Sequence, residues 1–167
     1  MNTKLSCAEA PRLNKKMPHV RLGTEADIPQ LLEMGRALHA ENAMMPLSED
    51  RIRAAAWRAI RQDRAMVGVI GPVGALEGMI YLTIGQFWYT DKPHLEELYA
   101  YVLPEFRRST NAKALVEFAK RSSERLKVPL LIGIISNDRT AAKIRMYKRQ
   151  LGEPAGAWFL HNGKTGR

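Results

Sequence analysis

The sequence predicts a single-domain α/β (α+β) fold in which a mixed central sheet is flanked by about four helices. Three observations lead to this class. Strand-like and helix-like apolar patterns follow one another in the order βααβββαβαβ. Turn residues such as Gly71 and Gly74 join the middle strands as antiparallel hairpins. The apolar segment 129–135 follows a helix and has no polar alternation, which is typical of a covered parallel strand.

The N-terminal elements follow from capping residues. A polar leader of residues 1–18 is expected to precede one domain that covers residues 19–167. The segment from Thr24 to Asp27 supplies helix-capping side chains, and the apolar spacing after it predicts a helix to about His39. Ser48 is a typical N-cap residue, so a second helix is expected directly after it.

The other elements follow from strand runs, turn signals and caps. They are a short strand at 19–22, a strand at 65–70, a long strand at 75–89, a strand at 95–102, a helix from Asn111, a buried strand at 129–135, a helix capped by residues 136–138 that ends before Gly152, and a last short strand at 157–161. The sequence shows no internal repeat, linker or low-complexity tract, so one domain is predicted.

The charge of the chain is large and uneven. The formal net charge is +9, and residues 103–150 hold twelve Lys or Arg against four acidic residues. Such a field suits a polyanionic ligand. Nucleic acid is the competing explanation, and a solvated basic face without a ligand is the third.

The location of the protein is predicted from what the sequence lacks. No apolar run approaches the roughly 18–20 residues of a membrane span, and the N-terminal segment has no apolar signal-peptide core. The single cysteine, Cys7, excludes an internal disulfide and favours a reducing compartment. We therefore expect a cytoplasmic protein that does not associate with a membrane.

The segment 95–115 contains an apolar strand, a break at Pro104, a basic turn and the start of a helix. A short strand-to-helix turn leaves the first backbone N–H groups of the helix unpaired and directed into the turn. The helix dipole adds a positive potential at the same place. Arg107 and Arg108 stand at the start of the turn, so the segment is predicted to bind a pyrophosphate.

Three short patterns in this segment resemble one known family. Val102-Leu-Pro104 ends the strand, Arg107-Arg-Ser-Thr-Asn-Ala112 forms the turn, and Ala114-Leu115 follows. Together they resemble the GNAT superfamily of acetyl-CoA-dependent N-acetyltransferases, whose signature is Gln/Arg-x-x-Gly-x-Gly/Ala after a Val-x-Pro strand end. Thr110 replaces the first glycine, so a positive φ there would be strained. The resemblance covers roughly residues 19–161 and implies a GNAT-like sheet of six to seven strands.

The resemblance implies acetyl-CoA as the co-substrate. Backbone amides of the turn would hold its pyrophosphate, because main-chain donors are fixed and converge on one point. This role falls to Arg108, Ser109, Thr110, Asn111 and Ala112, with Arg107 at the start of the turn. The pantetheine arm would pair with the strand at Val102 and Leu103, where a backbone amide would also polarise the thioester carbonyl.

Two glutamates on the strand are candidates for a general base, which acetyl transfer to a protonated amine needs. Alternation along the strand places Glu96 on the face of Ala100 and Glu97 on the other face. The resemblance implies a catalytic glutamate at the position of Glu96, which is the first candidate. Glu97 is the second, because a β-bulge would exchange the faces. The alternative for both is a carboxylate in solvent or in an ion pair.

The CoA thiolate that leaves the reaction is stabilised by a proton donor. Tyr147 stands about one turn before the predicted end of its helix, where the resemblance implies a tyrosine acid. Asn137 at the start of the same helix belongs to that pattern and joins the predicted cofactor-binding residues. The alternative for Tyr147 is an ordinary half-buried aromatic residue.

The predicted reaction is direct transfer of an acetyl group to a primary amine of a small molecule or a peptide. The alternative is a non-catalytic module of the same fold that binds nucleic acid or a protein partner through its basic face. A homodimer is compatible with both. The histidines have no metal-ligand spacing, so no metal site is predicted. Candidates for the acceptor pocket are the loop 41–46, Phe87, Trp88, Tyr89, Trp158 and His161.

Overall fold

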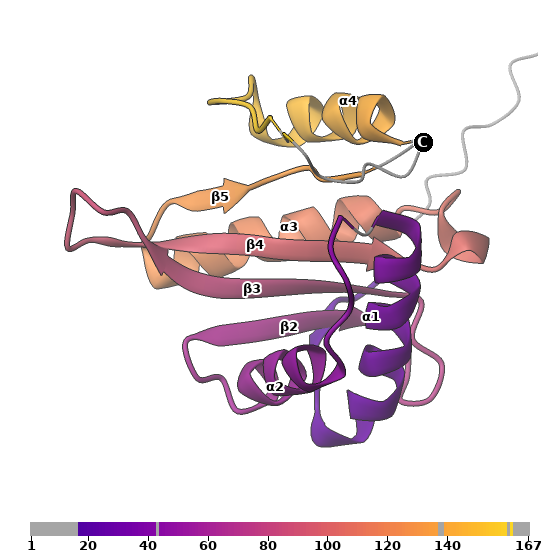
Figure 1. Cartoon of the computed structure of the whole chain (residues 1–167). Coiled ribbons are helices and arrows are strands. Elements are labelled where there is room, and N and C mark those ends of the chain that lie inside the picture. Colours follow the sequence, from indigo (N-terminus) through magenta and orange to yellow (C-terminus); the bar gives the residue numbers. More distant parts are fainter. Residues whose placement is uncertain (1–16, 43, 137–138, 160, 162–167) are drawn as a thin grey trace, which may run out of the picture.

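The computed structural model describes residues 17–42, 44–136, 139–159 and 161. Its elements are β1 (Arg21–Leu22), a 3-10 helix (Glu25–Asp27), α1 (Ile28–Asn42), α2 (Glu49–Ile60), β2 (Ala65–Ile70), β3 (Gly78–Gln86), β4 (Pro93–Val102), a 3-10 helix (Pro104–Phe106), α3 (Asn111–Leu126), β5 (Leu130–Ile132) and α4 (Thr140–Leu151). The strands form one sheet in the order β1-β2-β3-β4-β5 (Figure 1). Neighbouring strands are antiparallel except β4 and β5, which are parallel.

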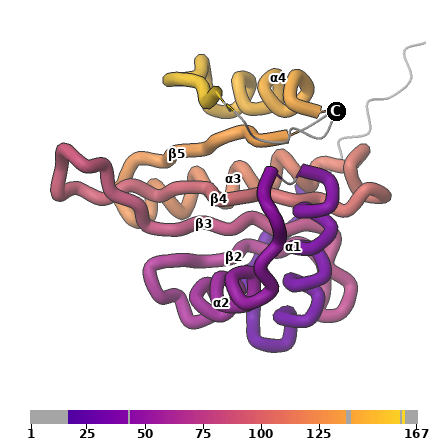
Figure 2. The backbone as a smooth tube through the Cα atoms, in the orientation of Figure 1, coloured from indigo at the N-terminus to yellow at the C-terminus, as the bar shows by residue number. Residues whose placement is uncertain are grey.

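Helices cover both faces of the sheet (Figure 2). α1 and α2 lie on one face, where Met34 packs in a core with Tyr81 of β3. α3 covers the other face, where Leu115 packs with Ile80 and Leu82 of the same strand. Successive side chains of β3 therefore enter two different cores. α4 lies beyond β5 at the edge of the sheet, and none of its residues is fully buried.

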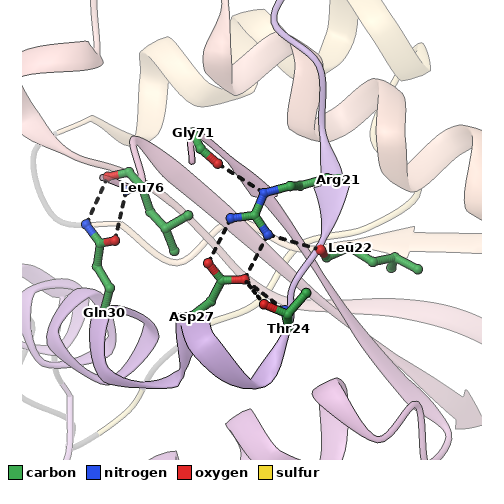
Figure 3. Close-up of polar contacts among 7 residues, drawn as sticks. All are labelled: Arg21, Leu22, Thr24, Asp27, Gln30, Gly71 and Leu76. Atoms are coloured by element: carbon green, nitrogen blue, oxygen red, sulfur yellow. Dashed lines mark hydrogen bonds and ion pairs between the residues drawn. The ribbon is translucent and has the colours of Figure 1, made fainter. Parts of the chain in front are cut away.

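A buried carboxylate fixes the entry into α1 (Figure 3). Asp27 is 0% exposed and accepts two hydrogen bonds of 2.8 Å from the Arg21 guanidinium. The backbone N–H and the hydroxyl of Thr24 donate to the same carboxylate. The hydrogen-bonded Arg21 side chain holds the pKa of Asp27 below its usual range. Because Arg21 also donates to the carbonyl of Gly71, this cluster joins β1, the helix start and the β2–β3 connection.

A second set of contacts extends from α1 to the turn after β4. Gln30 accepts a 2.9 Å hydrogen bond from the N–H of Leu76 and donates to its carbonyl (Figure 3). Glu77 follows Leu76 in the chain. Its carbonyl accepts a hydrogen bond from the N–H of Leu103, and its carboxylate accepts one from the Asn111 side chain. The start of α1 is thereby connected to both ends of that turn.

Several predictions from local signals are confirmed. Ser48 caps α2 by accepting a hydrogen bond from the N–H of Arg51. β2 has the predicted bounds, and α3 begins at Asn111. The α+β class and the four helices are confirmed over the described residues, although α1 continues to Asn42 instead of ending near His39.

The predicted number of strands was wrong for the described part of the chain, which has five instead of six to seven. Residues 157–159 form no strand, because they have no neighbouring strand to bond with; Trp158 and Phe159 are 83% and 96% exposed. β3 ends at Gln86, since residues 87–89 turn away from β4 at the tip of the hairpin.

Two other strand and helix predictions are modified. β5 keeps only Leu130–Ile132 of the predicted segment 129–135, because its pairing with β4 stops at Ile132. α4 begins at Thr140, and residues 137–138 of its predicted cap lie outside the described residues, as do residues 1–16 of the predicted leader.

Candidate functional site

The turn between β4 and α3 is formed without left-handed backbone. Thr110 has φ −90° and ψ 8°, so the β-branched residue that replaces glycine is not strained. The Ser109 hydroxyl accepts a 3.0 Å hydrogen bond from the N–H of Asn111. Hydrogen bonds among the described residues leave four N–H groups of this turn unused, those of Arg108, Thr110, Ala112 and Lys113. The turn therefore offers main-chain donors at the start of α3.

Arg107 links this turn to α1 and β4. Its Nη2 lies 2.6 Å from both carboxylate oxygens of Glu41, and the Tyr101 hydroxyl donates to Glu41 at 2.7 Å. Its Nε donates to the carbonyl of Val102 at 3.0 Å, and its guanidinium lies 5.4 Å from the centroid of the Tyr101 ring. Burial, with the hydrogen bond to Glu41, raises the pKa of Tyr101 to about 12. Arg107 therefore stabilises the turn by linking it to α1 and to β4.

A β-bulge in β4 decides where its two glutamates point. The register between β3 and β4 shifts by one residue, so that Leu82 pairs with Glu97 and Leu98 has no partner. Simple alternation, which grouped Glu96 with Ala100, was therefore wrong. Glu97 lies with Leu82 on the face covered by α3, and Glu96 lies on the opposite face.

The surroundings of Glu96 are a small polar cluster near the far end of β4. His94 Nε2 lies 3.8 Å from Glu96 Oε2, and His94 is only 5% exposed. Gly85 on β3 leaves room for both side chains, because a Cβ there would lie 2.6 Å from His94 Nε2 and 2.9 Å from Glu96 Oε2. The ring of His94 stacks on Phe87 at 4.4 Å between centroids. Glu96 is thus held beside a histidine.

Glu97 has a different environment, between β4 and α4. Burial raises the pKa of Glu97 to about 7, and the charge of Lys143 and a backbone hydrogen bond from Gly133 limit the rise. Burial and the nearby charge of Glu97 raise the pKa of the Tyr147 hydroxyl above its ordinary value. Glu97 can therefore accept a proton near neutral pH, while Tyr147 keeps its own and can donate it.

Two cavities lie along β4. The first, here called the carboxylate cavity, has a volume of about 320 Å³ and is lined by Glu96 and Glu97. The second, the turn cavity, has a volume of about 190 Å³ and is lined by Arg107 and Ala112. Three residues line both cavities: Ala100, Lys143 and Tyr147. The cavities therefore meet beside the tyrosine.

The edge of β4 that faces the turn cavity is open. β5 pairs with β4 only as far as Glu97. Leu103 donates to Glu77 on the β3 side, so alternation directs the backbone groups of Val102 and Ala100 toward the open edge. An extended ligand would find backbone hydrogen-bonding groups there, although Arg107 already bonds the carbonyl of Val102.

Two further kinds of feature are absent from the described part of the chain. None of its helices is both long enough and apolar enough to cross a membrane. None of its side-chain clusters brings together three or more His, Cys, Asp or Glu residues that could hold a metal ion.

Several solved structures have a fold similar to that of this chain. No family model and no curated sequence matches the chain. The structure of AAC(6')-Iy in complex with the bisubstrate analogue CoA-S-monomethyl-acetylneamine gives a TM-score of 0.67 at 14% identity, covering 89% of this chain and 99% of that one. A predicted acetyltransferase from Clostridium acetobutylicum, solved with acetyl-CoA, gives 0.67 at 14% identity, covering 87% and 96%. The protein has the GNAT acetyltransferase fold.

Another structure of similar fold is an integron cassette protein, HFX_CASS3, from the mobile metagenome of Cole Harbour Salt Marsh. It gives a TM-score of 0.66 at 22% identity and covers 86% of this chain and 88% of that one. At these identities the comparisons establish the fold.

Within this GNAT fold, the predicted site residues fall into groups by their position. Glu96 and Glu97 line the carboxylate cavity, and Tyr147 lines both cavities. Three predicted cofactor-binding residues line the turn cavity: Val102, Arg107 and Ala112. Five others line neither cavity: Leu103, Arg108, Ser109, Thr110 and Asn111. Asn137 lies outside the described residues.

The predicted acceptor residues are scattered by the fold. Trp158 lines the carboxylate cavity. Glu41, the last residue but one of α1, lines the turn cavity instead. The remaining aromatic and histidine candidates, Phe87, Trp88, Tyr89 and His161, line neither cavity.

Sequence reasoning missed two cations of the site, Lys143 and Arg139. Lys143 lines both cavities, and Arg139 lines the turn cavity. Lys143 precedes Tyr147 by four residues, so the two share a face of α4, and this spacing could have found it. No comparable signal connects Arg139 to the turn.

Proposed function

We propose that the protein is an N-acetyltransferase that moves the acetyl group of acetyl-CoA to a primary amine. The observation that carries this proposal is the meeting of the turn cavity and the carboxylate cavity beside Tyr147. CoA needs an anion-binding end and an extended channel, and acyl transfer needs a base and an acid where the channel ends. The similar structures solved with acetyl-CoA and with a CoA analogue support acetyl-CoA as the ligand.

The turn would hold the pyrophosphate. The unused N–H groups of Arg108, Thr110 and Ala112 lie at the start of α3, where the helix dipole favours an anion. The exposed side chain of Arg108 and that of Arg139 would add charge-assisted hydrogen bonds. Ser109 and Asn111 contribute to the shape of the turn, since the Ser109 hydroxyl accepts from the N–H of Asn111.

The pantetheine arm would lie along the open edge of β4. Ala100 and Val102 direct their backbone groups to that edge, whereas the N–H of Leu103 is bonded to Glu77. The edge therefore favours Ala100 and Val102 over Leu103 as the backbone partners of the arm. The thioester would then come to rest beside Ala100 and Tyr147, where the two cavities join.

The transfer needs one bond to form and one to break. The amine nitrogen attacks the thioester carbonyl carbon, a C–N bond forms, and the C–S bond breaks. Glu97 takes the proton that the amine loses, and Tyr147 gives its proton to the departing thiolate. The bulge favours Glu97 over Glu96 as the base, because Glu97 is the carboxylate whose charge acts on Tyr147. Glu96 lines the same cavity and is the second candidate.

Thiol release from acetyl-CoA in the presence of primary amines tests this function. Glu97→Gln is expected to lower kcat by about 100-fold while leaving the KM for acetyl-CoA unchanged, since a general base contributes roughly this much. Glu96→Gln, one residue away on the other face, is the matched variant and should lower kcat by less than Glu97→Gln. Equal losses in both variants would remove Glu97 from the role of base.

The exposed cations of α3 and its C-terminal end favour a second function, nucleic-acid binding by a non-catalytic module. Arg121, Arg125 and Lys127 are exposed on that side of the molecule. Retention on DNA or RNA that falls steeply with salt, together with a lack of acetyl-CoA binding, would establish this alternative. A homodimer stays a prediction under either function.

A further inference from the structure

The walls of the carboxylate cavity are mostly apolar. Aliphatic and aromatic side chains reach it from several elements, including Leu38 of α1, Tyr99 of β4, Ile132 of β5 and Ile134 in the connection after β5. Three charged side chains line it: Glu96, Glu97 and Lys143. The other lining side chains are aliphatic or aromatic, and among them only Tyr99, Tyr147 and Trp158 carry a polar atom.

Three large apolar side chains on the cavity wall are also exposed to solvent. Leu98 is 53% exposed, Ile135 is 57% exposed and Trp158 is 83% exposed. They come from three separate segments, the bulge of β4, the connection after β5 and the chain after α4. Single exposed apolar residues are common, but a group of them around one cavity is typical of a ligand-binding opening. A ligand with its own apolar surface would cover them.

The charged side chains of the carboxylate cavity can neutralise one positive charge of a ligand. Two carboxylates stand against the ammonium of Lys143, so the sum is one negative charge when both carboxylates are ionised. Each further ammonium group of a polycation would have to lie against the aliphatic walls without a counter-ion, which costs solvation energy. The net charge of +9 on the whole chain adds to the repulsion of a polycation.

We propose that the acceptor is a primary amine carried on an apolar body, an alkylamine or arylalkylamine with a single positive charge. This inference rests on the proposed acetyl transfer and names its substrate class. The ammonium group would lie by the carboxylates near Tyr147, and the apolar body would extend to Trp158 at the opening. A volume of about 320 Å³ is at the small end of the range for ligand sites, which suits a body of one or two rings.

In this reaction, the single ammonium loses one proton to a carboxylate before its nitrogen attacks the thioester carbon. The C–N bond forms, the C–S bond breaks, and the thiolate leaves with the proton of Tyr147. The acylated nitrogen then loses its second proton, which restores the Tyr147 hydroxyl. The products are an uncharged N-acetyl amide and free CoA. The amide no longer has a charge to pair with Glu97, so release of the product is favoured.

The test is a panel of acceptors with the full-length protein and saturating acetyl-CoA. Phenethylamine, tryptamine and hexylamine are compared with spermidine and kanamycin, by thiol release and by the mass of the N-acetyl product. The apolar amines are expected to have a kcat/KM at least tenfold above that of either polycation. A higher kcat/KM for spermidine or kanamycin would overturn the inference.

Two exposed tryptophans provide a matched pair of variants. Trp158→Ala should raise the KM for tryptamine about tenfold and leave the KM for acetyl-CoA unchanged. Trp88→Ala, at a side chain that is 95% exposed and lines neither cavity, should change neither KM. An unchanged KM for tryptamine in Trp158→Ala would contradict the proposed opening.

Calorimetry with acetyl-CoA separates failure of the proposed acceptor class from failure of the proposed acetyl transfer. If acetyl-CoA binds and the polycations are preferred, the acceptor class is wrong and the acetyltransferase proposal stands. If acetyl-CoA does not bind at millimolar concentration, both are wrong. Binding of acetyl-CoA with preference for the apolar amines supports both.

Discussion

The inner part of the molecule is packed more tightly than its outer layer. α3 buries residues from Asn111 to Ser122, among them Leu115 and Ala119, while α4 buries none and β5 is only half-buried. The ion pairs differ in the same way. Asp27, which pairs with Arg21, is fully buried, whereas the Glu153 side chain that pairs with Lys148 on α4 is 80% exposed. The fold is therefore stabilised mainly by β2, β3 and β4 with α1, α2 and α3.

The candidate site lies on the border between these two regions. Glu97 and Val102 come from β4 in the packed part, and Lys143 and Tyr147 come from α4 in the outer layer. The cavities exist because the outer layer does not close on β4 beyond Glu97. Regions with few buried groups open at lower free energy than the core, so changes in the inner part should alter stability and changes in the outer layer should alter activity.

The largest expected effect is on the buried ion pair. Asp27→Asn should lower the free energy of unfolding by about 3 kcal/mol, because it leaves the Arg21 guanidinium without its counter-ion. Urea unfolding followed by circular dichroism measures the change. Glu153→Gln, which removes the exposed ion pair of α4, should leave the midpoint unchanged. Equal effects of the two variants would contradict the contrast between the regions.

The second prediction concerns Tyr147 in the outer layer. Tyr147→Phe removes the proposed proton donor and keeps the shape of the ring, so kcat should fall by about 10- to 100-fold. The urea midpoint should change little, since Tyr147 is only half-buried. Steady-state thiol release at saturating acetyl-CoA measures kcat. Tyr89→Phe at the exposed hairpin tip is the control and should be as active as the unmodified protein.

The third prediction uses the pKa of Glu97, which burial raises to about 7. The folded state favours the protonated carboxyl of Glu97. The free energy of unfolding is therefore highest below the pKa that Glu97 has in the unfolded chain, and it falls as the pH rises through the folded pKa of about 7. Glu97→Gln mimics the protonated form and should be more stable than the unmodified protein at pH 8, by on the order of 1–2 kcal/mol. At pH 4 the two should unfold alike.

Thermal unfolding at several pH values provides the measurement. Glu105→Gln, at an exposed carboxylate outside both cavities, is the control and should show no such pH-dependent gain. A Glu97→Gln variant that gains no stability at pH 8 would contradict the burial of this carboxylate.

The smallest expected effect lies at the junction of the two regions. Tyr101→Phe removes the 2.7 Å hydrogen bond to Glu41 and leaves the ring beneath Arg107 in place. The loss should be about 1 kcal/mol in the free energy of unfolding, the typical contribution of one hydrogen bond. Urea unfolding would detect it, and a loss as large as that of Asp27→Asn would mean that the turn, and not the start of α1, holds the fold.

Local chemistry explains which parts of the fold the sequence could predict. Ser48 and Asn111 mark helix starts because caps and turn residues act on their immediate neighbours. Residues 87–89 and 157–159 have strand-forming side chains but no strand beside them, and only the tertiary structure decides that. The shift of register at Leu98 is of the same kind. The sequence shows that a bulge would exchange the faces of Glu96 and Glu97, but no glycine or proline marks its position.

The site divides in the same way. Val102, Arg107 and Ala112 could be predicted because they belong to short patterns in one stretch of chain, and Tyr147 because of its position near the end of α4. Glu41 was assigned to the acceptor pocket, and its pairing with Arg107 depends on the path of α1 across the sheet. Contacts between side chains 66 positions apart leave no periodic signal in a single sequence.

The central claim is that the turn and the open edge of β4 bind acetyl-CoA. Isothermal titration of the full-length protein with acetyl-CoA tests this claim most directly. The account predicts saturable binding of one acetyl-CoA per chain, with affinity that falls as salt is raised because phosphates meet cations and helix amides. An absence of heat at millimolar acetyl-CoA from protein that is shown to be folded would contradict it.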